Sequence, residues 1–160
     1  MTGMRLELIP VTEDEQLAAL ERLVCGDQQG TAEFGGFYGR ARTRLAPLLG
    51  PDRRAWLIEL DGVLVGFVDA DNDAGRVGLA YFVIASFRGK GVAKQAVARI
   101  LTAGVWPGAA LYTATIADQN VASIGVARAT GFQFVGRTDY GDEVWEHHVA
   151  EISRPETDAE

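Results

Sequence analysis

The sequence is short of several features that would mark particular classes of protein. It has 160 residues but a single cysteine, Cys25, so an intrachain disulfide is impossible and a reducing compartment is favoured. No apolar run approaches the roughly 18 residues of a membrane-spanning helix, and no basic and apolar leader opens the chain. Acidic residues outnumber basic ones, and the net charge of −7 argues against general nucleic-acid binding. We therefore expect a cytoplasmic protein with no membrane or nucleic-acid partner.

The composition, 48% hydrophobic and 23% charged, is that of an ordinary globular domain rather than of a disordered chain. We expect residues 1–152 to form one domain and residues 153–160 (SRPETDAE) to form a disordered acidic tail. Cys25 follows Leu23 and Val24 in a helical run without neighbouring positive charge, so we interpret it as a small residue facing the core.

Hydrophobic periodicity and turn residues predict the element order β-α-α-β-β-β-α-β-α-β-β. A capping box from Thr12 to Glu15 predicts the start of the first helix, and a second helix is expected over Phe34–Leu49. Asp61-Gly62 predicts a hairpin between two strands. A right-handed crossover makes the strand Ala110–Ile116 parallel to the strand that ends near Ala85. The fold class is α/β (α+β), a mixed, mostly antiparallel sheet of about seven strands with helices on both faces.

Strand, glycine-rich turn and helix follow one another between Tyr81 and Ala98, which is an arrangement suited to binding phosphate at a helix N-terminus. A Walker loop is excluded because Gly91 follows Lys90, where the pattern requires serine or threonine. A dinucleotide-binding fingerprint is excluded because Lys94 stands at the place of its third glycine. The pattern that remains is R-G-x-G-x-A, from Arg88 to Ala93.

This pattern resembles the acyl-CoA-binding signature of the GCN5-related N-acetyltransferase (GNAT) family. The wider segment GLAYFVIASFRGKGVAKQA is similar to the family's I-G-Y-W-V-x-P-x-x-R-G-x-G-x-A-x-E-A. A second segment, from Asn120 to Ile124 with Gly131-Phe132 after it, resembles the family's N-x-x-S-I and G-F. The element order also matches, so the resemblance covers residues 4–152. Within the family, the chain looks most like the branch of ribosomal-protein alanine N-acetyltransferases.

The resemblance implies acetyl-CoA as the acetyl donor. Backbone N–H groups of the turn and the helix dipole would hold the pyrophosphate, and an amide near Val83 would bond the thioester carbonyl. Asn120 would contact the pantetheine amide. The residues expected to bind the donor are Phe82, Val83, Ile84, Arg88, Gly89, Lys90, Gly91, Val92, Ala93, Lys94, Asn120 and Ser123.

The resemblance is less complete for the groups that move protons. Many family members have a tyrosine acid where this chain has Ala127, and the branch often has a glutamate where this chain has Gly78. The resemblance implies Ser123 as the proton donor or hydrogen bond to sulfur. An amine acceptor must also lose a proton, so a base is needed. Asp69, Asp71 and Glu143 are all candidates for that base.

No cluster of cysteine, histidine or carboxylate residues has the spacing of a metal site, so we expect no metal. The predicted function is transfer of an acetyl group from acetyl-CoA by direct attack of a primary amine, on a small molecule or a protein N-terminus. The alternative, motivated by Ala127 and Gly78, is a non-catalytic CoA-binding or interaction module of the same fold. Whether the protein forms a homodimer stays open at this point.

Overall fold

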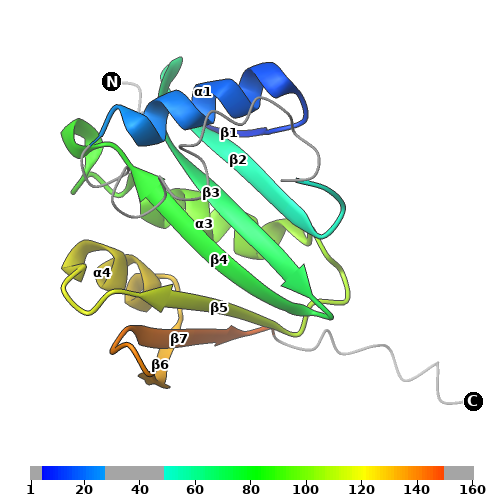
Figure 1. The fold of residues 1–160 in the computed structure, drawn as a ribbon, viewed down its shortest axis with the longest axis vertical. Helices are drawn as coiled ribbons and strands as arrows, with labels where there is room; N and C mark the ends of the chain where they lie inside the picture. The colour runs from blue at the N-terminus through cyan, green and yellow to red at the C-terminus, as the bar shows by residue number, and fades with distance from the viewer. Residues whose placement is uncertain (1–4, 28–48, 150–160) are drawn as a thin grey trace, which may run out of the picture.

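The computed structural model describes residues 5–27 and 49–149, which form a seven-stranded sheet with helices on both faces (Figure 1). The strands are β1 (Leu6–Pro10), β2 (Arg53–Leu60), β3 (Val63–Asp73), β4 (Arg76–Val83), β5 (Leu111–Ile116), β6 (Gln133–Arg137) and β7 (Glu143–His148). The helices are α1 (Asp14–Cys25), α3 (Val92–Ala103) and α4 (Val121–Ala129), with a 3-10 turn, η1, at Ala85–Phe87. This confirms the predicted fold class. Apart from Leu49, the predicted second helix lies outside the described residues, as does the predicted tail.

The spatial order of the sheet is β1-β2-β3-β4-β5-β7-β6, and only the β4–β5 pair is parallel. The predicted hairpin turn between β2 and β3 is confirmed, because Asp61 and Gly62 both have positive φ, at 50° and 84°. Ala74 and Gly75 form a second turn of this kind, at 53° and 91°. The chain crosses from β4 to β5 through α3, which gives the predicted parallel pair.

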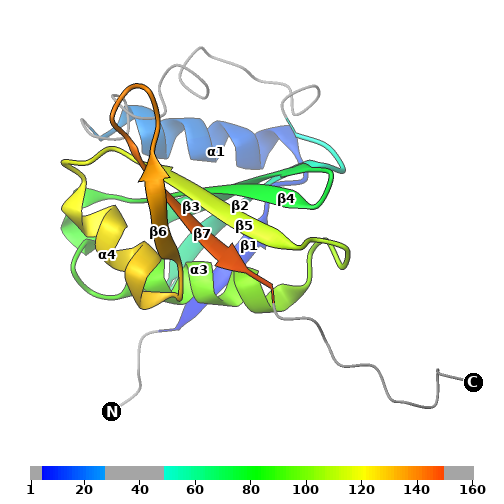
Figure 2. The same cartoon turned by 90° about the horizontal axis from the view of Figure 1, so that it is seen from below.

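The core has one layer on each face of the sheet (Figure 2). On one face, Leu17, Leu20 and Val24 of α1 are fully buried against residues of β2, β3 and β4 that include Phe67 and Phe82. On the other face, α3 and α4 pack against the sheet. The buried residues of these two helices are Val92, Ala96, Val97, Ile100, Ile124 and Ala127.

Two expectations about α1 are wrong. The capping box begins one residue later than predicted: Glu13 is the N-cap, and the Gln16 side chain accepts a hydrogen bond from the Glu13 N–H at 3.1 Å. Gln16 Oε1 also accepts from the Thr12 N–H at 2.6 Å, so the glutamine amide does what was expected of Glu15. Cys25 is exposed rather than buried, because it is the last helical residue and lies beyond the stripe that ends at Val24.

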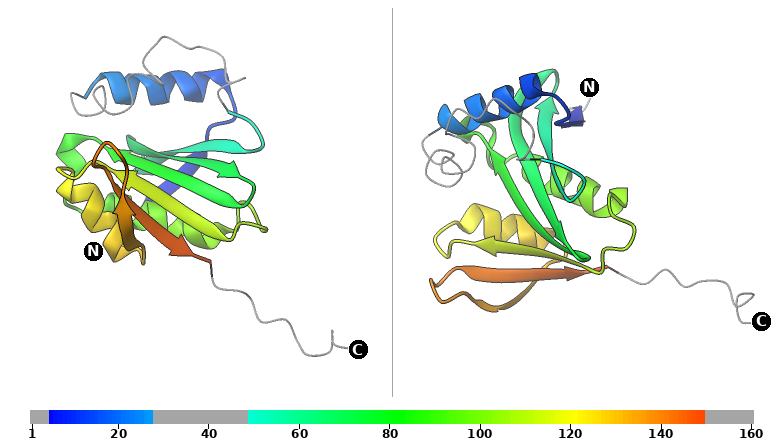
Figure 3. Two further views of the ribbon diagram at one scale, coloured as in Figure 1. Left: turned by 60° about the horizontal axis from the view of Figure 1, so that its bottom comes forward. Right: turned by 45° about the vertical axis from the view of Figure 1, so that its right-hand side comes forward.

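The two parallel strands are paired for only part of their length. Partners are Arg76 with Leu111, Val77 with Tyr112 and Gly78 with Thr113. Beyond Gly78 the strands diverge, as Figures 1 and 3 show. The β2–β3 register shifts between Ile58 and Glu59, and such a bulge bends the strands and increases their twist. This bulge lies at the end of the sheet where β4 and β5 are apart.

Candidate functional site

Two adjoining cavities lie where β4 and β5 diverge. The first, about 300 Å³, is enclosed by the end of β4, the glycine-rich turn, the start of α3 and one face of α4. The second, about 210 Å³, lies between β4 and β5. Tyr81, Asn120 and Ser123 line both cavities. The two spaces therefore meet at these three residues.

The glycine-rich turn exposes the N-terminus of α3 to the first cavity. Gly89 and Gly91 have φ of 77° and 78°, a region that side chains other than glycine enter only at a cost. Gly91 is the N-cap of α3 and offers no side-chain acceptor to the first turn. Val92, Ala93 and Lys94 form that turn and line the cavity. Because the first N–H groups of a helix lack intrahelical partners, this end of α3 can bind an anion.

The three cations of the turn differ in their surroundings. Lys94 is exposed and lines the first cavity. Lys90 is exposed, lies outside the lining of that cavity, and has its ammonium 5.9 Å from the centre of the Phe87 ring. Arg88 lines the cavity but also donates from Nε to the Val83 carbonyl at 2.7 Å. Of these three cations, only Lys94 is both exposed and part of the lining of the first cavity.

Some backbone N–H groups at the end of β4 point into the gap between β4 and β5. The Ile84 N–H donates to the Val65 carbonyl at 2.8 Å, so it points toward β3. Backbone groups of successive residues in a strand point to opposite sides, so the Val83 and Tyr81 N–H groups point toward β5. At this level β5 has already diverged from β4. The amide near Val83 thus has the direction expected for a bond to a ligand in the gap.

Two hydrogen bonds hold the first turn of α4. Asn120 is the N-cap, and its Oδ1 accepts from the Ser123 N–H at 3.2 Å. The Tyr81 hydroxyl donates to the Ser123 carbonyl at 2.6 Å and ties α4 to β4. Burial raises the pKa of Tyr81 well above its ordinary value, so the phenol stays neutral and remains a donor. Ser123 is thereby fixed where the two cavities meet.

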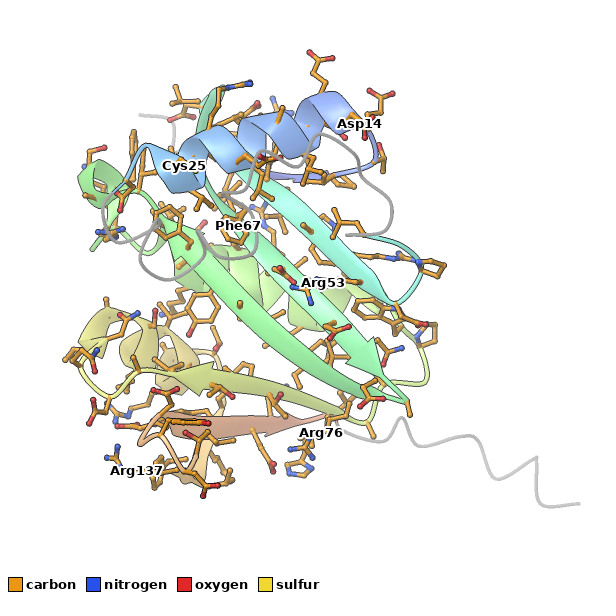
Figure 4. All side chains as sticks on the ribbon, viewed as in Figure 1. Asp14, Cys25, Arg53, Phe67, Arg76 and Arg137 are labelled. Carbon is orange, nitrogen blue, oxygen red and sulfur yellow. The ribbon has the colours of Figure 1, made fainter. Side chains whose placement is uncertain are left out.

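Of the predicted bases, Asp69 lies on β3, one strand from the gap. It is 4% exposed and pairs across the strands with Ala80, which lines the second cavity. Its carboxylate accepts a hydrogen bond from Arg53 Nη2 at 2.9 Å. Arg53 also lies 3.7 Å from Asp71, whose side chain is half exposed. Figure 4 shows Arg53 on the face of the sheet that α1 also covers.

Glu143 is on the other side of the site. Its Oε1 accepts from the Trp145 indole at 3.0 Å, and its Oε2 lies 3.5 Å from Arg137 Nη2. It lines neither cavity. The structure therefore brings Ser123 to the junction of the cavities. It places Asp69 and Glu143 one strand away, where each pairs with a residue that lines the second cavity, Ala80 and Ile116 respectively.

All but two of the predicted donor-binding residues line the first cavity; the exceptions are Ile84 and Lys90. The sequence interpretation missed one face of α4 and two aromatic residues. These additional lining residues are Tyr81, Phe87, Ala122, Gly125, Val126 and Ala129. The four α4 residues in this list are separated by three or four positions, so they lie on one face of the helix. This helical spacing of mostly small residues is the sequence pattern that could have identified them.

The described part of the chain contains neither a metal-binding cluster nor a membrane-spanning helix. Within 5–27 and 49–149, no group of three histidine, cysteine, aspartate or glutamate side chains is placed to hold a metal ion. In the same part of the chain, no helix is both long and apolar enough to cross a membrane.

Comparison with known proteins agrees with this geometry. Residues 5–133 match the family model described as an acetyltransferase (GNAT) domain. No curated protein sequence matches the chain significantly.

Solved structures share the fold at low sequence identity. The aminoglycoside acetyltransferase AAC(6')-Ib with coenzyme A has a TM-score of 0.72 and 16% identity, with 91% of this chain and 95% of that chain covered. The PaiA N-acetyltransferase of Thermoplasma acidophilum with coenzyme A has a TM-score of 0.71 and 15% identity, covering 92% and 100%. Mycobacterium smegmatis RimJ with CoA-disulfide has a TM-score of 0.64 and 21% identity, covering 89% and 81%.

Proposed function

The chain belongs to the GNAT family of acetyltransferases and is an acetyl-CoA-dependent N-acetyltransferase, and we propose that its donor site is the first cavity. One observation carries this proposal: β4 and β5 separate beside the N-terminus of α3. A gap between strands can accept an extended pantetheine arm, and the helix N-terminus can bind the pyrophosphate. The two features match the extended arm and the pyrophosphate of coenzyme A.

The pantetheine arm runs along the edge of β4 in this proposal, with the thioester near the junction of the two cavities. The Val83 N–H then donates to the thioester carbonyl and stabilises the negative charge that develops during attack. Asn120 contacts a pantetheine amide, and Lys94 contributes positive charge near the pyrophosphate. Support comes from the direction of the β4 amides and from the exposed position of Lys94 beside the cavity.

The reaction consists of one nucleophilic displacement. The neutral amine attacks the thioester carbon, a C–N bond forms, and the C–S bond breaks to release the thiolate of coenzyme A. Ser123 donates a hydrogen bond to the departing sulfur, which its position at the cavity junction supports. The proton of the amine passes to a base, for which Asp69 and Glu143 are both candidates, because each pairs across the strands with a residue that lines the second cavity.

The acceptor is a primary amine on a small molecule in this proposal. Asp69 and Asp71 both lie beside Arg53 on one face of the sheet, and the chain carries a net charge of −7, which favours a cationic substrate. Solved structures of AAC(6')-Ib, which shares this fold, contain ribostamycin or kanamycin together with coenzyme A. The motif resemblance to the branch of ribosomal-protein alanine N-acetyltransferases supports a protein N-terminus as the second candidate. We also propose that residues 1–152 act as one cytoplasmic domain.

Thiol release tests the function directly. Acetyl-CoA and the protein are incubated with aminoglycosides, polyamines and alanine-starting peptides, and released thiol is measured with dithionitrobenzoate. Acceptor-dependent release with one of the first two classes supports the small-molecule assignment, whereas release with peptides alone supports the second candidate. Binding of coenzyme A without release for any amine would support a non-catalytic module. Failure to bind coenzyme A would contradict the proposal altogether.

A further inference from the structure

One carboxylate joins the end of α1 to the turn that follows β4. Asp27 lies two residues after Cys25, the last residue of α1. Its Oδ1 accepts from Arg88 Nη2 at 3.2 Å, and its Oδ2 accepts from the Ala85 N–H at 3.2 Å. The Asp27 side chain is only 11% exposed, so water screens these contacts weakly. The two oxygens of a single side chain thus hold both η1 and the arginine of the glycine-rich turn.

The guanidinium of Arg88 is directed inward by three contacts. Besides the bond to Asp27, Nε donates to the Val83 carbonyl at 2.7 Å. The guanidinium carbon also lies 5.3 Å from the centre of the Phe82 ring, which is within the range of a cation–π contact. Two acceptors and one ring fix the plane of the group. This orientation is that of a structural side chain rather than of a cation directed at a ligand phosphate.

These contacts fix the last peptide group of β4 at both ends. Arg88 holds the Val83 carbonyl, and the N–H of the same peptide, which belongs to Ile84, donates to Val65 on β3. The next amide back along the chain is the Val83 N–H. Its direction depends on the conformation of Val83, which the fixed peptide restricts.

We propose that Asp27 and Arg88 form a positioning pair that orients the Val83 amide for the transition state, and that Arg88 is not a ligand of the pyrophosphate. This rests on the proposed function, in which the thioester lies against the edge of β4. The pair acts on the chemical step rather than on affinity for coenzyme A. If the Val83 N–H is displaced by a fraction of an ångström, it stabilises the transition state less. The helix N-terminus that binds phosphate is unchanged by that displacement.

Two nearly isosteric variants separate positioning from phosphate binding. Asp27→Asn keeps the shape but presents an amide NH₂ to one of two donors, Arg88 Nη2 or the Ala85 N–H. Arg88→Lys keeps the positive charge but cannot hold two acceptors with one planar group. A lysine can still serve as a point charge for phosphate, so a phosphate-binding role would survive this change. Glu7→Gln is the control, because it removes an exposed ion pair with Arg5.

The experiment measures kcat, KM for acetyl-CoA and the Kd of coenzyme A for each protein. We expect both site variants to lower kcat about tenfold or more, with KM and Kd within threefold of the wild type. The double variant should be no slower than the slower single variant, because the two residues act as one unit. Glu7→Gln should behave as the wild type.

Three results would overturn the inference. The first is a kcat within twofold of the wild type for both variants. The second is a loss of coenzyme A affinity in Arg88→Lys while Asp27→Asn is normal, which would make Arg88 a phosphate ligand. In the third, the wild type itself shows no acceptor-dependent thiol release; this refutes the proposed function and the inference with it. Active variants beside an active wild type refute the inference alone.

Discussion

Replacing Gly91 with glutamate is a perturbation whose effects on stability and on ligand binding can be separated. Gly91 is the N-cap of α3 and has a φ of 78°. A non-glycine residue in this left-handed region costs about 1–2 kcal/mol. For a chain of this size, that lowers Tm by roughly 2–8 °C. A Cβ at this position meets only the end of the Gln95 side chain, at 3.9 Å, so steric strain adds little.

The effect on coenzyme A should be larger than the effect on folding. The new carboxylate stands at the helix N-terminus where the pyrophosphate is proposed to bind. Two unit charges about 6 Å apart repel by about 3 kcal/mol at an effective dielectric constant of about 20. That energy corresponds to a Kd raised about 100-fold or more, and the double charge of a pyrophosphate increases it further. Isothermal titration calorimetry with coenzyme A measures the change.

Gly62→Glu is the matched control for this experiment. Gly62 has a φ of 84° in the β2–β3 hairpin, and a Cβ there meets nothing within 4 Å. The variant therefore carries the same charge and a similar backbone strain at a residue that lines neither cavity. It should lose a similar amount of Tm and bind coenzyme A as the wild type does. Our reasoning is refuted if Gly91→Glu binds within threefold of the wild type, or if both variants lose affinity equally.

Three further changes test the packing and the site. Gly66→Ala places a Cβ 2.1 Å from the Phe82 carbonyl oxygen, so we expect a loss of about 3 kcal/mol, or roughly 10 °C in Tm, by thermal unfolding; an unchanged Tm would contradict the β3–β4 packing. Burial raises the pKa of Tyr81, so the unfolded phenol ionises first, and its stabilisation is present below about pH 10 and lost as the pH rises further. Urea unfolding at pH 9 and pH 11 should show a smaller decline for Tyr81→Phe than for the wild type, and an equal decline would count against the burial of this phenol. Ser123→Ala removes the proposed hydrogen bond to sulfur and should lower kcat about 10- to 100-fold. KM for acetyl-CoA should stay within threefold, because the contacts of Ser123 with Tyr81 and Asn120 use its backbone and are kept. Full activity would exclude a role for the hydroxyl.

The fold was predictable because its local signals agree with one another. The Asp61-Gly62 turn and the strand–turn–helix around Gly91 are set by neighbouring residues, and each is confirmed. The capping box was displaced by one residue because Glu13 and Gln16 can make the same bonds as Thr12 and Glu15. The sequence alone cannot decide between two such pairs of capping residues that are offset by one position. The backbone conformation at the start of the helix decides which pair makes the bonds.

The site was predictable where the backbone carries it and not where side chains from distant segments meet. The positive φ values of the glycine-rich turn occur at Gly89 and Gly91, and glycine is the residue that favours such values. The partner of Arg88, however, is Asp27, which lies 61 positions earlier in the chain. Periodicity within a segment contains no information about such a contact. The same holds for Tyr81 and Ser123, which are 42 positions apart.

Hydrogen–deuterium exchange with and without coenzyme A tests most directly whether the gap between β4 and β5 is the donor site. We predict that coenzyme A slows exchange at the Val83 amide and at the amides of residues 89–94. Exchange in the β2–β3 hairpin around Gly62, which lines neither cavity, should not change. Protection confined to another part of the chain, or no protection at saturating coenzyme A, would contradict the account.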